Sequence, residues 1–268
     1  MPQDHALALV GLAKRYRETP AVDDVSLAVA PGEVVALLGP SGSGKSTIFR
    51  CVSRLTPADA GEIWVLGTRM DQLQGAALRI QRRSIGLIFQ QFNLIGRLSA
   101  IDNVLAGRLG SVGMIRATLR AFAHADRQLA LAALDRVGML EKAYQRADSL
   151  SGGQQQRVAI ARVVAQQSRI ILADEPVASL DPTAADNVLT LLRSIARERG
   201  IGVLCSLHQT DLAQRYADRI VALKRGRVVV DAAATTIGAD ELARIYRVVD
   251  GAPATQAMPV AEVSRLRA

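Results

Sequence analysis

The sequence has little cysteine, few aromatic residues and no long apolar run. Its only two cysteines, Cys51 and Cys205, lie far apart in the chain, so neither a disulfide framework nor a zinc site is expected. Aromatic residues make up 3% of the chain, which leaves few rings for stacking on nucleic-acid bases. The longest uncharged stretch, 84–96, is shorter than the roughly 18 residues that a membrane-crossing helix needs. The first residues lack a secretion signal, so we expect a cytoplasmic protein.

The composition that remains is typical of a folded globular protein. Hydrophobic residues make up 49% of the 268 residues and charged residues 22%, enough to bury a substantial core. Basic residues exceed acidic ones by 33 to 25, a net charge of +8, which favours an anionic partner such as a nucleotide, a nucleic acid or lipid headgroups. The basic residues are spread out rather than gathered in one block. A solvated surface beside a membrane is therefore favoured, and no nucleic-acid partner is expected.

Short apolar segments alternate with helical patterns along most of the chain. Such alternation predicts an α/β fold with a largely parallel sheet that is covered on both faces. From about residue 98 to 149 helical periodicity dominates, which predicts an inserted helical subdomain. The predicted strands are 6–12, 25–29, 34–38, 61–66, 85–89, 170–173, 203–206, 220–223 and 228–230, and helices are predicted over 45–54, from 151 to about 166, and from 183.

The strongest motif follows the predicted strand 34–38. It fits the pattern of a glycine, four residues, then Gly-Lys-Ser/Thr, at a strand-to-helix junction. Its glycines let backbone N–H groups and the helix N-terminus converge on phosphate oxygens. Lys45 would neutralise the β- and γ-phosphates of a bound nucleotide, the Ser46 hydroxyl would ligate Mg²⁺, and Thr47 would line the pocket. The motif consists of Gly39, Pro40, Ser41, Gly42, Ser43, Gly44, Lys45, Ser46 and Thr47.

Two adjacent acids end the apolar strand 170–173. Because side chains alternate along a strand, Asp174 and Glu175 should point in different directions and have different tasks. We assign Asp174 to the Mg²⁺ shell and Glu175 to the general base that polarises the attacking water. Taken alone, two acids could simply end a strand at the surface. Downstream of a phosphate-binding loop, the catalytic interpretation is favoured.

A second anion-binding pattern begins the helix at residue 151. Ser151 is a good helix N-cap, and the paired glycines Gly152 and Gly153, followed by Gln154, leave backbone N–H groups uncovered. On local grounds alone a simple capped helix explains this sequence. Together with the phosphate-binding loop, the acid-tipped strand and a downstream histidine, however, the Leu-Ser-Gly-Gly-Gln sequence resembles the ATP-binding subunit of an ABC transporter. The resemblance covers about residues 6 to 230.

This resemblance implies a P-loop NTPase fold of the ABC type. It implies a RecA-like α/β core with an N-terminal antiparallel β subdomain over residues 1–97 and 151–250. The helical subdomain of 98–150 would end at the signature motif, and 251–268 would be a C-terminal tail. The family has glycine where this chain has Arg54, which affects local packing at the end of a helix.

The resemblance also implies functions for single residues. Gln90 corresponds to the Q-loop glutamine, which meets the metal and the attacking water, although Gln91 beside it leaves a one-place ambiguity. His208 corresponds to the switch histidine that contacts the γ-phosphate. Asp181 lies in the D-loop that links two nucleotide sites, and Tyr16 resembles the aromatic residue that stacks on adenine.

Finally, the resemblance implies partners. It implies a head-to-tail homodimer in which Ser151 and Gly153 of one chain close over the ATP and Mg²⁺ held by the other. Two transmembrane permease subunits would dock on 94–101 and the helical insertion, at the cytoplasmic face of the inner membrane. The segments 89–94, 96–99 and 172–182 resemble the ATPase of bacterial phosphonate importers, which implies indirect service to a periplasmic phosphonate-binding protein.

Two other functions compete with this one. A soluble ABC-type ATPase, for example an accessory protein of carbon–phosphorus bond cleavage, would share the ATP motifs, as would an ABC importer or exporter subunit for another cargo. A small-molecule kinase also has a phosphate-binding loop, but that function leaves Ser151 to Gln154 and His208 without a task.

Overall fold

The computed structural model describes residues 4–112 and 122–238. Among these residues the strands form two sheets, a six-stranded one in the order β10-β9-β3-β8-β7-β6 and a four-stranded one in the order β2-β1-β4-β5. The expected tail 251–268 lies outside the described residues. No helix of the described part is both long and apolar enough to cross a membrane.

The six-stranded sheet is parallel except at one edge. Strands β6, β7, β8, β3 and β9 pair in parallel, and β10 pairs antiparallel with β9. Every residue of β3 and of β8 is buried, because a parallel sheet has cover on both faces and its strands are apolar throughout. The predicted parallel sheet is confirmed. Its strands are β3 (Val34–Leu38), β6 (Ile85–Ile88), β7 (Ile170–Asp174), β8 (Gly202–Ser206), β9 (Arg219–Lys224) and β10 (Arg227–Ala233).

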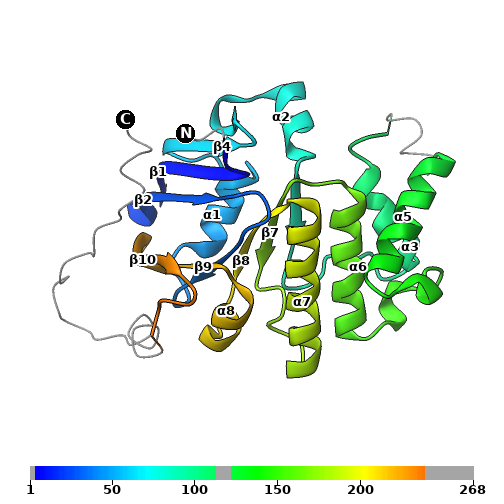
Figure 1. Ribbon diagram of the computed structural model, residues 1–268. Coiled ribbons are helices and arrows are strands. Elements are labelled where there is room, and N and C mark those ends of the chain that lie inside the picture. The colour runs from blue at the N-terminus through cyan, green and yellow to red at the C-terminus, as the bar shows by residue number, and fades with distance from the viewer. Residues whose placement is uncertain (1–3, 113–121, 239–268) are drawn as a thin grey trace.

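Different elements cover the two faces of this sheet (Figure 1). Val34, Ala36 and Leu38 of β3 contribute to a core with the helices α6 (Gly152–Ala165), α7 (Pro182–Arg199) and α8 (Thr210–Tyr216). The alternate residues Val35 and Leu37 pack into a second core with α1 (Lys45–Val52) and the smaller sheet. The short helix α8 was not predicted, because seven residues are too few to show a clear helical period.

The smaller sheet is antiparallel, and its first hairpin is longer than predicted. Register shifts interrupt the pairing of β1 with β2 at three places, so the apolar and polar residues do not alternate cleanly and the pattern hides the ends of both strands. The hairpin therefore extends to Tyr16, beside the loop that follows β3. The strands are β1 (Leu7–Tyr16), β2 (Thr19–Val29), β4 (Ala60–Val65) and β5 (Thr68–Arg69).

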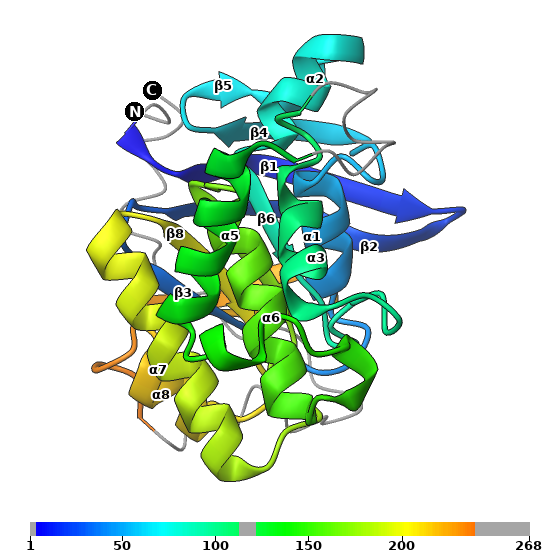
Figure 2. The same ribbon diagram turned by 90° about the vertical axis from the view of Figure 1, so that its right-hand side faces the viewer.

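Helical elements occupy much of the segment between β6 and α6. α3 (Ala100–Leu105) and α5 (His124–Arg136) lie beside α6 (Figure 2). Short 3₁₀ turns connect them: η3 (Ala106–Arg108), η4 (Leu140–Lys142) and η5 (Ala147–Ser149). The boundaries 98 and 150 of a helical subdomain remain a prediction. Between β5 and β6, η2 (Met70–Gln72) precedes α2 (Gly75–Arg82). This helix was not predicted, and it buries none of its residues.

Arg54 adopts the left-handed conformation, with φ of 58°. It follows Ser53, the C-cap of α1, at a position where glycine usually ends a helix because glycine has no Cβ to clash. Its contacts show how the end of this helix is packed. The side chain of Arg54 donates to the Leu73 carbonyl, and its own carbonyl accepts from Arg82.

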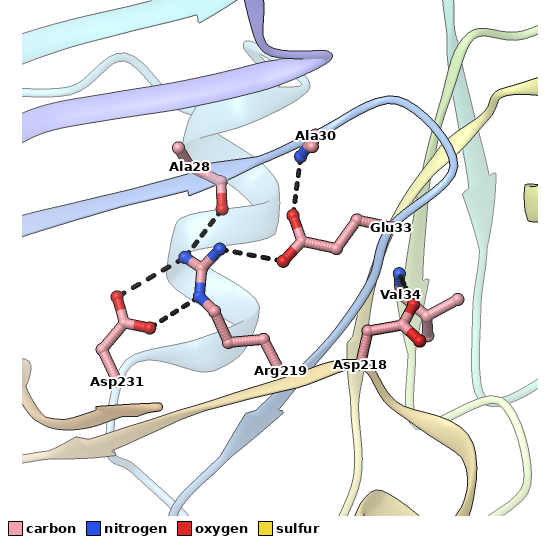
Figure 3. A network of polar contacts seen from close by, with 7 residues as sticks. All are labelled: Ala28, Ala30, Glu33, Val34, Asp218, Arg219 and Asp231. Carbon is pink, nitrogen blue, oxygen red and sulfur yellow. Dashed lines mark hydrogen bonds and ion pairs between the residues drawn. The ribbon is translucent and has the colours of Figure 1, made fainter. Parts of the chain in front are cut away.

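Arg219 ties the two sheets together (Figure 3). From β9 its guanidinium donates to Asp231 on β10 at 2.6 Å, to Glu33 at 3.0 Å and to the carbonyl of Ala28 on β2 at 2.9 Å. Glu33 in turn accepts from the Ala30 N–H. Both carboxylates are largely buried, with side-chain exposures of 10% for Asp231 and 18% for Glu33, so they need this cation as a partner.

We predict that Arg219→Gln lowers the free energy of unfolding by about 2–3 kcal/mol, because two poorly hydrated carboxylates lose their counter-charge. Urea denaturation measures this change. Arg227→Gln is the matched control: it breaks the exposed pair with Asp23 and should cost less than about 1 kcal/mol. Equal losses for the two variants would contradict the assignment.

Candidate active site

The predicted phosphate-binding loop connects β3 to α1 and depends on two glycines. Gly39 has φ of 145°, and a Cβ built there would lie 2.3 Å from the Leu223 carbonyl oxygen. Gly44 has φ of 108°, and a Cβ there would lie 2.4 Å from the Ala21 carbonyl oxygen. No other residue type fits such contacts, so the loop is packed tightly against β9 and β2.

Lys45 closes the loop on itself. Its ammonium donates to the carbonyls of Gly39 at 2.7 Å and Pro40 at 3.2 Å, and only 5% of the residue is exposed. Burial lowers the pKa of Lys45, and the nearby Glu175 and Asp174 oppose this shift. No side chain caps α1, so the N–H groups of its first turn remain directed outward. A buried cation and uncovered N–H groups make the loop a site for an anion.

The loop forms one wall of a pocket of about 370 Å³. Ser41 to Thr47, Ala21, Tyr16 and Glu175 line it. Ser43 is buried, and its hydroxyl oxygen has no hydrogen-bond partner in the described structure. An unpaired buried hydroxyl is costly unless a ligand satisfies it, so the pocket fits a phosphate-bearing molecule.

Tyr16 lies at the mouth of this pocket and is 42% exposed. The ammonium of Lys14 lies 5.8 Å from the centre of its ring. Lys14 is itself held by Asp59 at 2.7 Å, and Asp59 also accepts from the Arg15 N–H. The hydrogen bond to Asp59 raises the pKa of Lys14. The ring is thereby held where a flat, apolar group could stack on it.

Asp174 and Glu175 line different pockets. The cause is the left-handed backbone of Glu175 rather than the alternation of side chains along a strand. Asp174 is the last residue of β7, whereas Glu175 lies beyond the strand with φ of 49°. Both are bound by Ser206, which faces Asp174 across the parallel pairing of β7 and β8. The Ser206 hydroxyl donates to Asp174 at 2.8 Å and accepts from the Glu175 N–H at 2.8 Å. Ser206 was not predicted, because its only signal in the sequence is that of a polar residue at the end of an apolar strand.

Glu175 pairs with His208. The His208 Nε2 lies 2.5 Å from a carboxylate oxygen of Glu175. When the Glu175 carboxylate is ionised it only accepts hydrogen bonds, so this ring nitrogen is then the donor. The structure therefore brings together the predicted base and the predicted switch histidine, at the edge of the pocket that the loop lines.

Ser46 and Asp174 line a second, smaller pocket of about 110 Å³ next to the loop. Within the described ranges no cluster of three or more His, Cys, Asp or Glu residues could hold a metal. Mg²⁺ needs only one or two protein ligands when phosphates and water supply the others, so a hydroxyl and a carboxylate in one pocket fit it. Gln90 is exposed and lines neither pocket, and neither it nor Gln91 is brought to these ligands.

The Ser-Gly-Gly turn lies apart from the pocket. Ser151 and Gln154 form a reciprocal capping box at the start of α6, and no residue of 151–154 lines the phosphate pocket. Gly152 instead lies near Leu180, and Gly153 near Ala184 at the start of α7. Asp181 caps α7 by accepting from the Ala184 N–H at 2.9 Å. Within one chain, the two predicted anion sites are separate.

Comparison with known proteins identifies the family. Residues 22–178 match the family model described as ABC transporter. The chain is 52% identical over 243 residues to the phosphonates import ATP-binding protein PhnC of Frankia casuarinae, over 90% of this chain and 96% of that protein. The chain belongs to the ABC transporter family. It is therefore an ABC-type ATPase, which binds and hydrolyses ATP, and the expected α/β fold of this class is confirmed.

Two further relatives of this ABC ATPase are informative. The hypophosphite import ATP-binding protein HtxD of Stutzerimonas stutzeri is 47% identical over 249 residues, 93% of this chain and 73% of that protein. A dimeric structure of the ATP-binding cassette MJ0796, in a post-hydrolysis state bound to ADP and phosphate, matches with a TM-score of 0.74 and 33% identity. It covers 85% of this chain and 98% of that one.

We predict that Ser206→Ala lowers kcat for ATP hydrolysis roughly 10- to 100-fold, with a smaller effect on KM, because the Asp174 carboxylate loses a donor and the Glu175 backbone N–H loses its acceptor. Steady-state ATPase assays measure this. Ser168→Ala is the control: it removes another buried hydroxyl, which donates to the Val163 carbonyl far from the acids, and should leave kcat unchanged. An unchanged kcat in Ser206→Ala would contradict the positioning role.

Proposed function

We propose that this chain is the ATP-hydrolysing subunit of an importer for phosphonates or related phosphorus oxyanions. The ATPase part of the proposal rests on one pocket that the glycine loop, Tyr16 and Glu175 line together. His208 forms a hydrogen bond with Glu175 at this pocket. The cargo rests on the names of the relatives, which concern phosphonates and hypophosphite. Both cargoes are small oxyanions of phosphorus, which favours this class over an unrelated cargo.

The residues of the pocket suggest a division of tasks. Tyr16 would stack on adenine, while Gly39 to Thr47 would bind the phosphates through backbone N–H groups and Lys45. Ser46, Asp174 and, after a movement of its loop, Gln90 would hold Mg²⁺, which supplies charge neutralisation at the phosphates. Glu175 would accept a proton from water as its oxygen attacks the γ-phosphorus, and the bond to the β-phosphate oxygen would break.

The Glu175–His208 contact suggests how the site is held before nucleotide arrives. The Nε2 proton that Glu175 now binds is the proton that His208 would donate to a γ-phosphate oxygen. Binding of the triphosphate would therefore compete for this proton and free the Glu175 carboxylate to bind water. The base becomes available only when the group to be attacked is present.

The separation of the two anion sites supports a shared site in a dimer. In a head-to-tail homodimer, Ser151 to Gln154 of one chain would close over the nucleotide held by the other, and Asp181 would lie at the junction. The dimeric structure of the MJ0796 cassette, bound to ADP and phosphate, supports a dimer of such chains. Loss of the γ-phosphate would remove the group that both chains share, so the dimer would loosen after hydrolysis.

We further propose that the dimer works at the cytoplasmic face of the inner membrane with two permease subunits. A periplasmic phosphonate-binding protein would deliver the cargo to them. The proposed division of the chain places the ATP-binding core in 1–97 and 151–250 and the helical subdomain in 98–150. No partner role for nucleic acid is proposed, because the pocket lacks further rings for base stacking.

We predict that Glu175→Gln lowers kcat at least about 100-fold while ATP stays bound and dimers accumulate, because the amide cannot accept the proton but keeps the shape of the side chain. ATPase assays and size-exclusion chromatography with ATP measure the two effects. Normal hydrolysis by Glu175→Gln would show that Glu175 is not the base. A separate variant, Lys45→Ala, tests the loop: if it still bound ATP tightly, the loop would not be the phosphate site.

We predict that adding Ser151→Ala to Glu175→Gln weakens the ATP-dependent dimer about tenfold without changing ATP affinity of the monomer, because the hydroxyl acts on the partner's nucleotide. Sedimentation across a concentration series measures the dimer constant. Ser99→Ala is the matched control, since Ser99 is the N-cap of α3 outside the proposed interface. An equal loss from both variants would show that helix capping alone explains the effect.

We predict that a strain without this gene fails to grow on methylphosphonate as sole phosphorus source but grows on phosphate. The wild-type gene should restore growth and the Lys45→Ala gene should not. Unchanged growth of the deletion strain on methylphosphonate, with loss of growth on hypophosphite, would replace the proposed cargo by the other oxyanion.

A further inference from the structure

The aromatic wall of the phosphate pocket lies at an irregular end of the β1–β2 hairpin. Register shifts interrupt the pairing of the two strands on both sides of Lys14. The residue opposite Arg15 in the ladder is Pro20, which has no N–H to donate. The ladder therefore holds β1 weakly just before Tyr16, the residue that lines the pocket. Some other group must fix the position of this ring.

Asp59 holds this end of β1 from outside the hairpin. It lies directly before β4, and its carboxylate binds two different groups of β1. One oxygen accepts from the Lys14 ammonium and the other from the Arg15 N–H, both at 2.7 Å. The N–H of Asp59 also donates to the Ala13 carbonyl at 2.9 Å. A single acid thus binds three consecutive residues of β1, immediately before the ring.

The position of Asp59 is itself fixed by close backbone packing. Gly61, two residues further on, has φ of 90°, and a Cβ built there would lie 2.4 Å from the Gly11 carbonyl oxygen and 2.7 Å from the Leu12 Cα. Only glycine fits such contacts, so β4 passes β1 with the two backbones in direct contact. Asp59 therefore reaches the end of β1 from a rigid base rather than from a free loop.

Lys14 connects Asp59 to the ring. Its ammonium lies over the Tyr16 ring, 5.8 Å from the ring centre, which leaves the other face of the ring for a ligand. The side chain of Lys14 is only 11% exposed, so the ammonium needs a counter-charge. The hydrogen bond between them raises the pKa of Lys14 and lowers that of Asp59. The ammonium also lies within electrostatic range of Cys51 on α1, the helix that begins at the phosphate loop.

We propose that Asp59 is a positioning residue that determines how strongly the pocket binds the base of a nucleotide. Asp59 holds Lys14 against the Tyr16 ring, and this contact keeps the ring at a fixed distance from the phosphate loop. This role rests on the proposed function, in which Tyr16 stacks on adenine. A ring that is already in place loses less conformational freedom when the nucleotide binds, so the affinity is higher.

Asp59 acts only through its neighbours. It is outside the set of described residues that line the phosphate pocket, whereas Tyr16 is within it. Its printed side-chain contacts are those with Lys14 and with the Arg15 N–H. Removing its charge should therefore weaken nucleotide binding only as long as the ring is present. A general loss of structure would instead weaken binding with or without the ring.

Calorimetric titration of the full chain with ADP and Mg²⁺ tests this dependence. ADP carries the base and has no γ-phosphate to lose, so binding is measured without hydrolysis. Asp59→Asn keeps the shape of the side chain but removes its charge, and it should raise the Kd for ADP about fivefold. In a chain that carries Tyr16→Ala, the same substitution should change the Kd less than about twofold, because no ring is left to position.

Asp186→Asn is the matched control. The Asp186 side chain is 39% exposed, against 44% for Asp59, and it pairs with Arg215 on α8 outside the phosphate pocket. This variant should leave the Kd for ADP unchanged in both backgrounds. Lys14→Met should repeat the effect of Asp59→Asn, whereas Lys14→Arg should keep the Kd within about twofold of the wild-type value, because arginine can still bind the carboxylate and lie over the ring.

Two outcomes would overturn the role of Asp59 alone. One is an unchanged Kd in Asp59→Asn while Tyr16→Ala raises it. The other is an equal loss of affinity with and without the ring, since Asp59 would then act elsewhere. If Tyr16→Ala itself left the Kd unchanged, the stacking role in the proposed function would fail, and the role of Asp59 with it. Should Asp59→Asn not fold, Lys14→Met decides by the same comparison: a loss confined to the chain with Tyr16 supports the role, and an equal loss in both contradicts it.

Discussion

The parallel pairing of β3, β7 and β8 is the constraint on which the candidate site depends. Because the three strands run in one direction, their carboxyl ends meet at one edge of the sheet, where ligands of open α/β sheets bind. The glycine loop leaves β3 there, Asp174 ends β7, and Ser206 ends β8 two residues before His208. A shift of the β7–β8 register by one residue would take Ser206 away from both acids and turn the buried faces over. The pairing of the strands therefore determines which side chains meet at the site, and the loops that follow the strands set their final positions.

Features that depend on local sequence were predicted well, and those that depend on distant contacts were not. The glycine loop was predictable because φ of 145° at Gly39 and 108° at Gly44 admits only glycine. The buried strands were predictable because every residue in them is apolar or small. Ser206 could not be assigned, since its task exists only through the pairing with Asp174. The long β1–β2 hairpin was missed because bulges disturb its alternation, and α2 because it buries no residue. The individual site roles remain predictions, although the fold brings Tyr16, Lys45 and Glu175 to one pocket.

The Ser-Gly-Gly turn packs against the start of α7 and the segment before it. Gly152 contacts the region of Leu180, Gly153 that of Ala184, and Asp181 caps α7 beside them. Glycine at 153 suits this packing, because a Cβ there would lie 3.3 Å from the Ala184 Cβ and α7 would have to move by a few tenths of an ångström. Since the segment around Asp181 follows Glu175 along the chain, a partner's nucleotide that moved the Ser-Gly-Gly turn would act on the proposed base of the same chain. The two sites of a dimer would then sense each other without a long pathway.

Helix α6 makes a second connection within the chain. Arg162 lies on the helix that begins with the Ser-Gly-Gly turn, and it binds the carbonyls that follow Gln90. Helix α6 therefore connects two places: the proposed dimer contact at its first turn and the segment after Gln90. A helix of 14 residues bends only gently, because a sharp kink would interrupt its backbone hydrogen bonds, so a displacement at one end moves the other end as well. In the proposed dimer, a partner's nucleotide that displaced the first turn of α6 would consequently act on the segment after Gln90 as well, so that closure of the dimer and the position of this segment would change together.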